Sequence, residues 1–140
     1  MMELEKALIL YILKRQNDIH PFRISRILLL FEIEYSNKFG EKPTNFVYRL
    51  QPYTFYIEGF TNFIGSIPEI EKIREIDDKG IPVRGYLHLK NPEIQVDLPK
   101  EMTEILDNIL KMTSDWDDQK LNQFVVATED YQKLYEEFGD

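Results

Sequence analysis

Residues 47–68, VYRLQPYTFYIEGFTNFIGSIP, decide how the middle of this chain folds. Before Pro52, the segment NFVYRL alternates apolar and polar positions, which predicts a short strand. After Pro52 the apolar side chains recur at spacings of three and four, which predicts a helix over residues 53–67. The buried face of that helix would hold Tyr56, Phe60, Phe63, Ile64 and Ile67. Core packing accounts for most of the aromatic rings in this stretch.

Two helices are expected before this stretch. Leu4, Leu8 and Tyr11 share one face of residues 3–16, with glutamates in the first turn and Lys14 and Arg15 in the last, as the helix dipole prefers. A second helix starts at Pro21 and continues to about residue 38, where Gly40 provides a stop. It is apolar around much of its circumference, which predicts a central position.

A hairpin and further helices are expected after it. Residues 71–90 contain two alternating runs separated by DDKG, which predicts a β-hairpin. Pro99 starts another helix, SDWD at 114–117 resembles a capping box, and Thr128 caps a last short helix. The inward side chains of that last helix are expected to be Tyr131, Leu134, Tyr135 and Phe138.

This order of elements predicts the fold class. Three helices, a hairpin and further helices form an α+β, mostly helical fold with a winged-helix-like core, one β-hairpin and a C-terminal helical extension. The connections are short, so residues 1–140 are expected to form a single domain. Winged helices bind DNA in some proteins and proteins in others, so this fold does not define a function.

Composition restricts the environment and the partners. The chain has no cysteine, and its longest apolar runs are too short to span a bilayer, so we expect a cytoplasmic protein without a membrane partner. The net charge is −8, and residues 97–140 hold twelve acidic side chains against four basic ones. An acidic surface is repelled by phosphate backbones and attracts basic proteins.

No pattern in the chain is typical of catalysis. His20 and His88 are the only histidines, and neither occurs in a metalloprotease or nucleophile motif. The acidic cluster at 115–118 lacks the spaced ligands and the glycine of a calcium loop. We therefore expect no enzymatic activity, no metal and no cofactor. An enzyme of another type remains an alternative, which a buried cleft with several titratable groups would support.

Two sets of residues are candidates for binding. Tyr53, Phe55 and Trp116 fall outside the expected helix stripe, and together with Arg49 they predict an exposed patch for a protein partner. The alternative is a nucleic-acid site on the hairpin, formed by Arg74, Lys79, Arg84 and Lys90. The expected third helix has no Lys or Arg, which disfavours its use as a DNA recognition helix.

The order of two segments resembles a known family. RILLLFEIEYSNKFGEKP, residues 26–43, and VYRLQPY, residues 47–53, are similar to the helix and the AWkyGPV element of the Panacea domain, also called the SocA-like antitoxin domain. Pro52 matches the proline of that element, whereas Gln51 replaces its glycine. LNQFVVAT, residues 121–128, is similar to the closing helix, with Glu129 in place of the histidine that commonly follows.

The resemblance implies an intracellular α+β domain that acts by binding, because members of that family are proposed to neutralise a toxin or present it to a protease. The expected function is therefore a non-enzymatic protein-binding module, antitoxin-like or adaptor-like, for a basic partner protein. The alternative is a winged-helix DNA-binding transcriptional regulator. The chain is expected to be a monomer or a homodimer.

Overall fold

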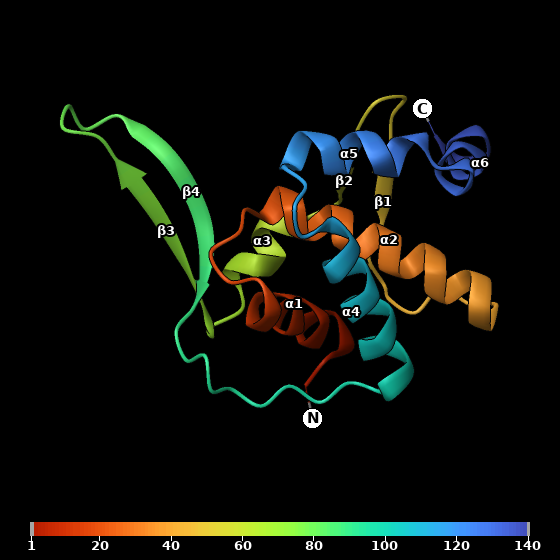
Figure 1. The fold of residues 1–140 in the computed structure, drawn as a ribbon, viewed down its shortest axis with the longest axis horizontal. Helices are drawn as coiled ribbons and strands as arrows, with labels where there is room; N and C mark the ends of the chain where they lie inside the picture. Colours follow the sequence, from red (N-terminus) through yellow and green to blue (C-terminus); the bar gives the residue numbers. More distant parts are fainter. Residues whose placement is uncertain (1, 140) are drawn as a thin grey trace.

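The fold is α+β and mostly helical, as the sequence predicts. A computed structural model describes residues 2–139 and forms them into six helices and two separate antiparallel ribbons (Figure 1). The helices are α1 (Leu4–Arg15), α2 (Pro21–Phe39), α3 (Phe60–Gly65), α4 (Lys100–Thr113), α5 (Asp118–Ala127) and α6 (Glu129–Phe138). The strands are β1 (Tyr48–Leu50), β2 (Phe55–Ile57), β3 (Ile70–Ile76) and β4 (Pro82–Leu89).

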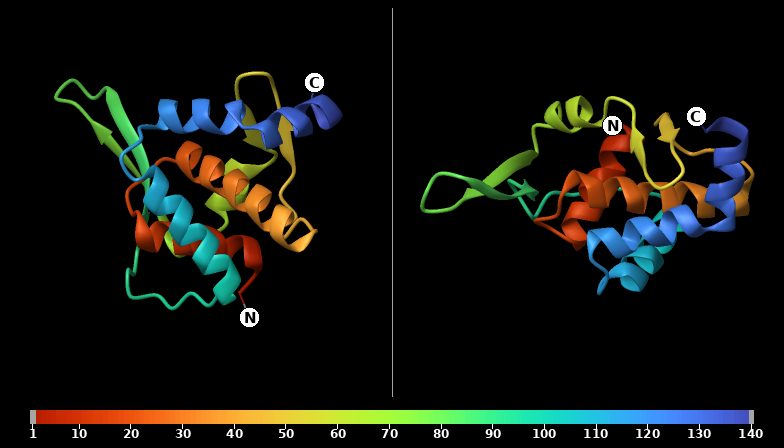
Figure 2. Two further views of the ribbon diagram at one scale, coloured as in Figure 1. Left: turned by 45° about the vertical axis from the view of Figure 1, so that its right-hand side comes forward. Right: turned by 90° about the horizontal axis from the view of Figure 1, so that it is seen from above.

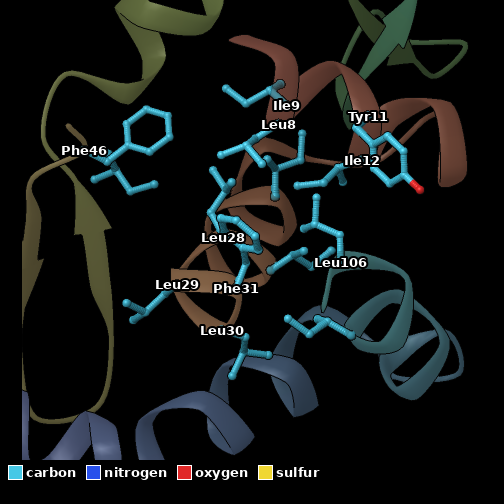
Figure 3. Packing of buried hydrophobic residues seen from close by; sticks show 14 of the residues in the cluster. Leu8, Ile9, Tyr11, Ile12, Leu28, Leu29, Leu30, Phe31, Phe46 and Leu106 are labelled. Carbon is cyan, nitrogen blue, oxygen red and sulfur yellow. The ribbon is translucent and has the colours of Figure 1, made fainter. Parts of the chain in front are cut away.

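Helix α2 is the centre of the core. It packs against α1, α4 and α5, and its apolar side chains are buried over most of its length. Leu8 and Ile12 of α1 point toward Leu28 of α2, and Leu106 of α4 closes the same cluster (Figure 3). The predicted central position of the second helix is therefore confirmed.

The ends of α2 are fixed by the residues that the sequence indicates. The His20 imidazole accepts a hydrogen bond of 3.0 Å from the Phe22 amide, and Pro21 occupies the first turn. Gly40 ends the helix with a φ of 77°, a left-handed conformation that glycine adopts without steric cost.

The predicted helix over residues 53–67 is wrong. Residues 48–50 and 55–57 form a second, shorter hairpin, in which Leu50 pairs with Phe55. Gly59 then adopts a φ of 69°, and only Phe60–Gly65 are helical. The alternation of buried Phe55, exposed Tyr56 and buried Ile57 outweighs the helical spacing of the aromatic rings, because both strands bury one face against α2 and α6.

The β3–β4 hairpin is confirmed and projects from one end of the molecule, as both views in Figure 2 show. Its base is buried through Ile70, Leu87 and Leu89, and Leu87 also bridges to Ile19. Its turn is held by the Asp77 carboxylate, which accepts hydrogen bonds from the amides of residues 79 and 81.

The three C-terminal helices cover α2 and the first ribbon. Thr128 caps α6 by accepting from the Tyr131 amide, so this predicted start is confirmed. The capping box predicted over residues 114–117 is wrong, because Ser114 ends α4 and Asp117 itself caps α5 by accepting from the Lys120 amide. Tyr131 is fully buried, but Phe138 is 68% exposed, so its predicted inward position is wrong. None of the helices within residues 2–139 has the length and apolar character needed to cross a bilayer.

Candidate functional site

The β1–β2 ribbon has one buried and one exposed face. Tyr48, Leu50, Phe55 and Ile57 alternate toward the core. The opposite face, together with the turn, is exposed, and we call it the ribbon face: Val47, Arg49, Tyr53, Tyr56 and Glu58. Tyr53 is 84% exposed and Tyr56 55%, which places two aromatic rings on one small surface.

Short-range contacts arrange the ribbon face. Arg49 lies directly opposite Tyr56 in the strand register, and its guanidinium donates to the Glu58 carboxylate at 2.7 and 3.1 Å. The Glu58 amide donates to the Val47 carbonyl at 2.8 Å, which extends the pairing by one residue. On the ribbon face, the Arg49–Glu58 ion pair therefore lies between Val47 and Tyr56.

A buried arginine positions the ribbon from behind. The Arg26 guanidinium lies 3.7 Å from the ring centroid of Phe22 and 4.0 Å from that of Phe55. It donates to the Thr54 hydroxyl at 2.7 Å and to the Phe55 carbonyl at 2.8 Å. No carboxylate of the described residues lies within ion-pair distance of it. Burial therefore lowers the pKa of Arg26 to about 10.

Helices α5 and α6 hold the turn of the ribbon. The Tyr131 hydroxyl lies 2.7 Å from the Gln51 carbonyl and 2.9 Å from the Thr54 carbonyl, and the Asn122 amide donates to the Tyr53 carbonyl at 2.9 Å. The backbone that carries the exposed Tyr53 ring is therefore fixed, so less conformational entropy is lost when this ring contacts a partner.

A second buried network fixes the start of the ribbon. Glu32 is 4% exposed, and its carboxylate accepts from the Thr44 hydroxyl at 2.5 Å and from the Tyr48 hydroxyl. Lys42 lies 3.4 Å from the same carboxylate and donates to the carbonyls of Thr44 and Phe46. Burial, and next the negative charge of Glu32, raise the pKa of Tyr48.

The predicted partner-binding residues differ in their exposure to solvent. Arg49 and Tyr53 lie on the ribbon face and are exposed, so a partner could contact both. Phe55 is only 3% exposed, so the expectation that its ring is exposed is wrong. Its neighbour Tyr56 takes that place, which the alternation of Phe55, Tyr56 and Ile57 would have indicated.

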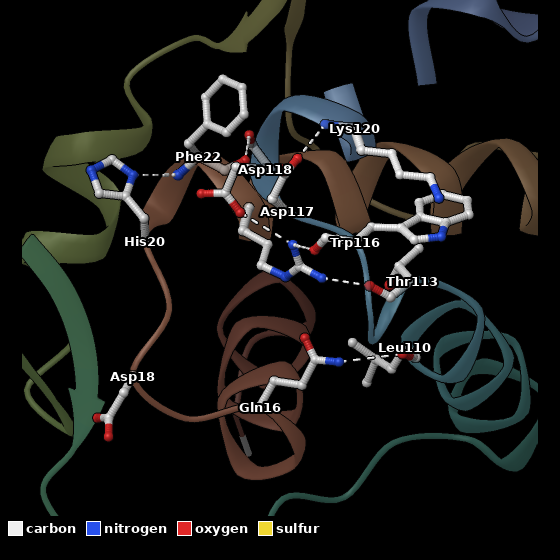
Figure 4. A network of polar contacts seen from close by, with 12 residues as sticks. Gln16, Asp18, His20, Phe22, Leu110, Thr113, Trp116, Asp117, Asp118 and Lys120 are labelled. Atoms are coloured by element: carbon white, nitrogen blue, oxygen red, sulfur yellow. Dashed lines mark hydrogen bonds and ion pairs between the residues drawn. The ribbon is translucent and has the colours of Figure 1, made fainter. Parts of the chain in front are cut away.

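Trp116 belongs to the connection between α4 and α5. It is half-buried, with its ring centroid 4.8 Å from that of Phe124. The Lys120 ammonium lies 5.0 Å from the centroid of the same Trp116 ring (Figure 4). The Trp116 carbonyl accepts from the buried Arg23, which also donates to the Thr113 carbonyl. These contacts give Trp116 a role in joining α2 to α5.

The basic residues of the alternative site lie on or beside the β3–β4 hairpin. Arg84 is engaged there: its guanidinium stacks 4.3 Å from the Tyr86 ring centroid and lies 3.7 Å from the Glu75 carboxylate. Arg74, Lys79 and Lys90 are exposed and form no ion pair within residues 2–139. Acidic residues alternate with these cations along the hairpin, so its charge is mixed.

The two histidines are engaged in local structure. His20 caps α2, and His88 places its Nδ1 atom 2.6 Å from the Asp18 carboxylate at the base of the hairpin. Asp18 has a φ of 63°, so this pair fixes a left-handed turn between α1 and α2. Residues 2–139 contain no group of three or more His, Asp or Glu side chains arranged to hold a metal ion.

Comparison with known proteins identifies no relative of this chain. Models of known families, curated proteins and solved structures were compared with the chain, and none of them matches it.

Proposed function

We propose that this protein is a non-enzymatic protein-binding module, of the antitoxin or adaptor kind, that contacts a basic partner protein through the ribbon face. The observation that carries the proposal is the exposure of Tyr53 and Tyr56 beside Arg49 on a backbone fixed by buried contacts. Tyrosine and arginine are among the residue types enriched at the centres of protein interfaces.

The charge of the chain supports a basic partner. The net charge is −8, and α6, which packs against β1, carries Glu129, Asp130, Glu136 and Glu137 against Lys133. Charges at the rim of an interface act mainly on the association rate, which falls with added salt. The tyrosines are then expected to determine how long the complex lasts.

The test is capture of partners from the native cells by the tagged protein, with nuclease present, followed by mass spectrometry. We expect one stoichiometric basic protein. The double variant Tyr53→Ser/Tyr56→Ser is expected to weaken its binding by about tenfold or more. The control, Ile81→Ser/Val83→Ser, removes side chains of similar exposure (55% and 63%) from the β3–β4 hairpin and should retain the partner. Equal retention by both variants would refute the ribbon face as the binding surface.

The same experiment separates this proposal from DNA binding. The projecting hairpin, where Arg74 and Lys79 form no ion pair with any residue in the range 2–139, is the feature that favours a DNA-binding regulator (Figure 1). That alternative predicts no stoichiometric protein partner, retention of duplex DNA when nuclease is omitted, and an affinity that falls steeply with salt. It also predicts loss of DNA when Arg74 and Lys79 are replaced by alanine.

A further inference from the structure

Two hollows meet at Val47, on the edge of the ribbon face. One, of about 650 Å3, is bounded by the start of α1, residues 45–47 and the start of α3. The other, of about 410 Å3, is bounded by α2, β1 and α6. Phe46 and Val47 line both hollows, so the two lie side by side at the edge of the ribbon face, and we call the pair of hollows the groove.

The first hollow is acidic. Glu3, Glu5 and Glu58 line it, and no Lys or Arg is among its described lining residues. Glu58 is neutralised by Arg49, whereas Glu3 and Glu5 have no Lys or Arg within ion-pair distance in residues 2–139. The Glu5 carboxylate accepts a hydrogen bond of 2.9 Å from the Asn45 amide, so its charge is held at the wall of the hollow, and no Lys or Arg among the described residues acts as its counter-ion.

The second hollow is apolar. Its walls are mostly hydrocarbon, from Leu29, Ile33, Phe46, Leu50, Leu134 and Phe138. It reaches solvent beside Val47 and Phe138, which are 48% and 68% exposed. The carboxylate of Glu32 lies at its wall with its hydrogen bonds already satisfied by Thr44 and Tyr48, so the segment that shapes the hollow is fixed before any ligand arrives.

We infer that this groove binds a segment of the partner protein in which apolar side chains are followed by lysine or arginine. The apolar side chains occupy the hollow between α2 and α6, and the cations lie beside Glu3 and Glu5. Charge complementarity selects this occupant, because uncompensated carboxylates line one hollow while the other offers apolar surface. The inference rests on the proposed function, since it names the chemistry of the partner and adds the groove to the ribbon face.

The test uses synthetic fluorescent peptides and the intact protein. The probe peptide has leucines in its first half and lysines in its second, one control peptide replaces the lysines with glutamates, and another replaces the leucines with serines. We expect saturable binding of the probe alone, measured by fluorescence anisotropy at moderate salt. Both control peptides should bind at least about tenfold more weakly, because each lacks one of the two contacts.

Three variants locate the site. Val47→Asp is expected to weaken probe binding by about tenfold or more, since it places a charge between the two hollows. Glu3→Gln/Glu5→Gln is expected to weaken binding about fivefold. Glu93→Gln/Glu101→Gln removes the same charge from exposed positions outside both hollows and should change the affinity less than about twofold.

Several results would overturn the inference. If Glu3→Gln/Glu5→Gln and Glu93→Gln/Glu101→Gln lower the affinity for the probe equally, only the net charge attracts the peptide. If the glutamate control peptide binds as tightly as the probe, Glu3 and Glu5 have no role in binding. A dimer in solution that Phe138→Ser converts to a monomer would identify a second copy of the chain as the occupant.

The inference and the proposed function can fail separately. A partner that needs Tyr53 and Tyr56 but is insensitive to Val47→Asp would leave the proposed function standing and refute the groove. If the protein binds the probe saturably but captures no partner from its cells, the result would support peptide binding in the groove and refute the proposed protein-binding function.

Discussion

The hydroxyl of Tyr48 donates a hydrogen bond to the carboxylate of Glu32, and this contact joins the β1–β2 ribbon to the buried side of α2. Glu32 is almost inaccessible, and Thr44 satisfies its other oxygen. The ribbon face and the groove both begin at Val47, the neighbour of Tyr48. The buried Tyr48–Glu32 contact therefore helps to position both of these surfaces.

Tyr48→Phe should lower the free energy of unfolding by about 1–3 kcal/mol, because it leaves a buried carboxylate oxygen without its donor. Urea denaturation followed by circular dichroism measures the change. Tyr56→Phe is the matched control: it removes the same hydroxyl from the exposed face of the ribbon and should stay within about 0.5 kcal/mol of the parent. Similar losses in both variants would contradict a special role for the contact with Glu32.

Stability is expected to fall at alkaline pH. Burial and Glu32 raise the pKa of Tyr48 above its ordinary value of 10.0, so the folded protein keeps the proton that the unfolded chain releases. The stabilising contribution is full below about pH 10 and is lost as the pH rises through the folded pKa. Tyr11 and Tyr131, whose pKa values burial also raises, add to the same trend.

Tyr48→Phe provides the check on this pH dependence. The decrease in unfolding free energy above pH 10 should be smaller in the variant than in the parent, because one of the contributing groups is gone. Identical pH dependences for the two proteins would show that Tyr48 does not contribute.

Arg26→Lys should lower the free energy of unfolding by about 2–4 kcal/mol. A lysine keeps the charge, but its single ammonium cannot replace the fork that reaches Thr54, Phe55 and Asn122 between two aromatic rings. The control Arg49→Lys changes the same group on the exposed face, where we expect less than about 1 kcal/mol. Denaturation curves for the two variants that coincide would refute the structural role of Arg26.

Gly40→Ala should cost about 1 kcal/mol, because Gly40 ends α2 with a φ of 77° that alanine rarely adopts. Gly65→Ala is a suitable control, since Gly65 lies in α3, has no positive φ and leaves open space for a methyl group. The thermal midpoint should therefore fall for the first variant and stay the same or rise slightly for the second. The opposite order would contradict the left-handed cap.

Local signals in the sequence predict most of the fold. Pro21 and Gly40 define α2, Thr128 defines the start of α6, and the DDKG turn defines the β3–β4 hairpin, because each acts through its own backbone or its near neighbours. The region after Pro52 has two local patterns that compete. Its aromatic spacing favours a helix, but the pairing of Leu50 with Phe55 and the burial of Phe55 beneath Arg26 and Tyr131 depend on residues far away in the chain.

The candidate site is less predictable for the same reason. Arg49 and Tyr53 are found from the pattern, because both fall outside the apolar stripe of residues 53–67, although the helix which that stripe predicts does not form. Whether Phe55 or Tyr56 faces solvent depends on which side of the ribbon α2 covers. The groove joins residues from both ends of the chain, such as Glu5 and Phe138, and their proximity is a property of the completed fold.

The base and the turn region of the projecting β3–β4 hairpin should differ in whether they unfold together with the rest of the protein. The hairpin's buried side chains, Ile70, Leu87 and Leu89, all lie at the base, while Ile76, Ile81 and Val83 near the turn are more than half exposed. Amide protons at the base should therefore exchange with solvent only when the whole protein unfolds, whereas those near Gly80 exchange through local fraying. A protease that cleaves at residues 77–80 should accordingly yield two fragments that stay associated in a folded particle.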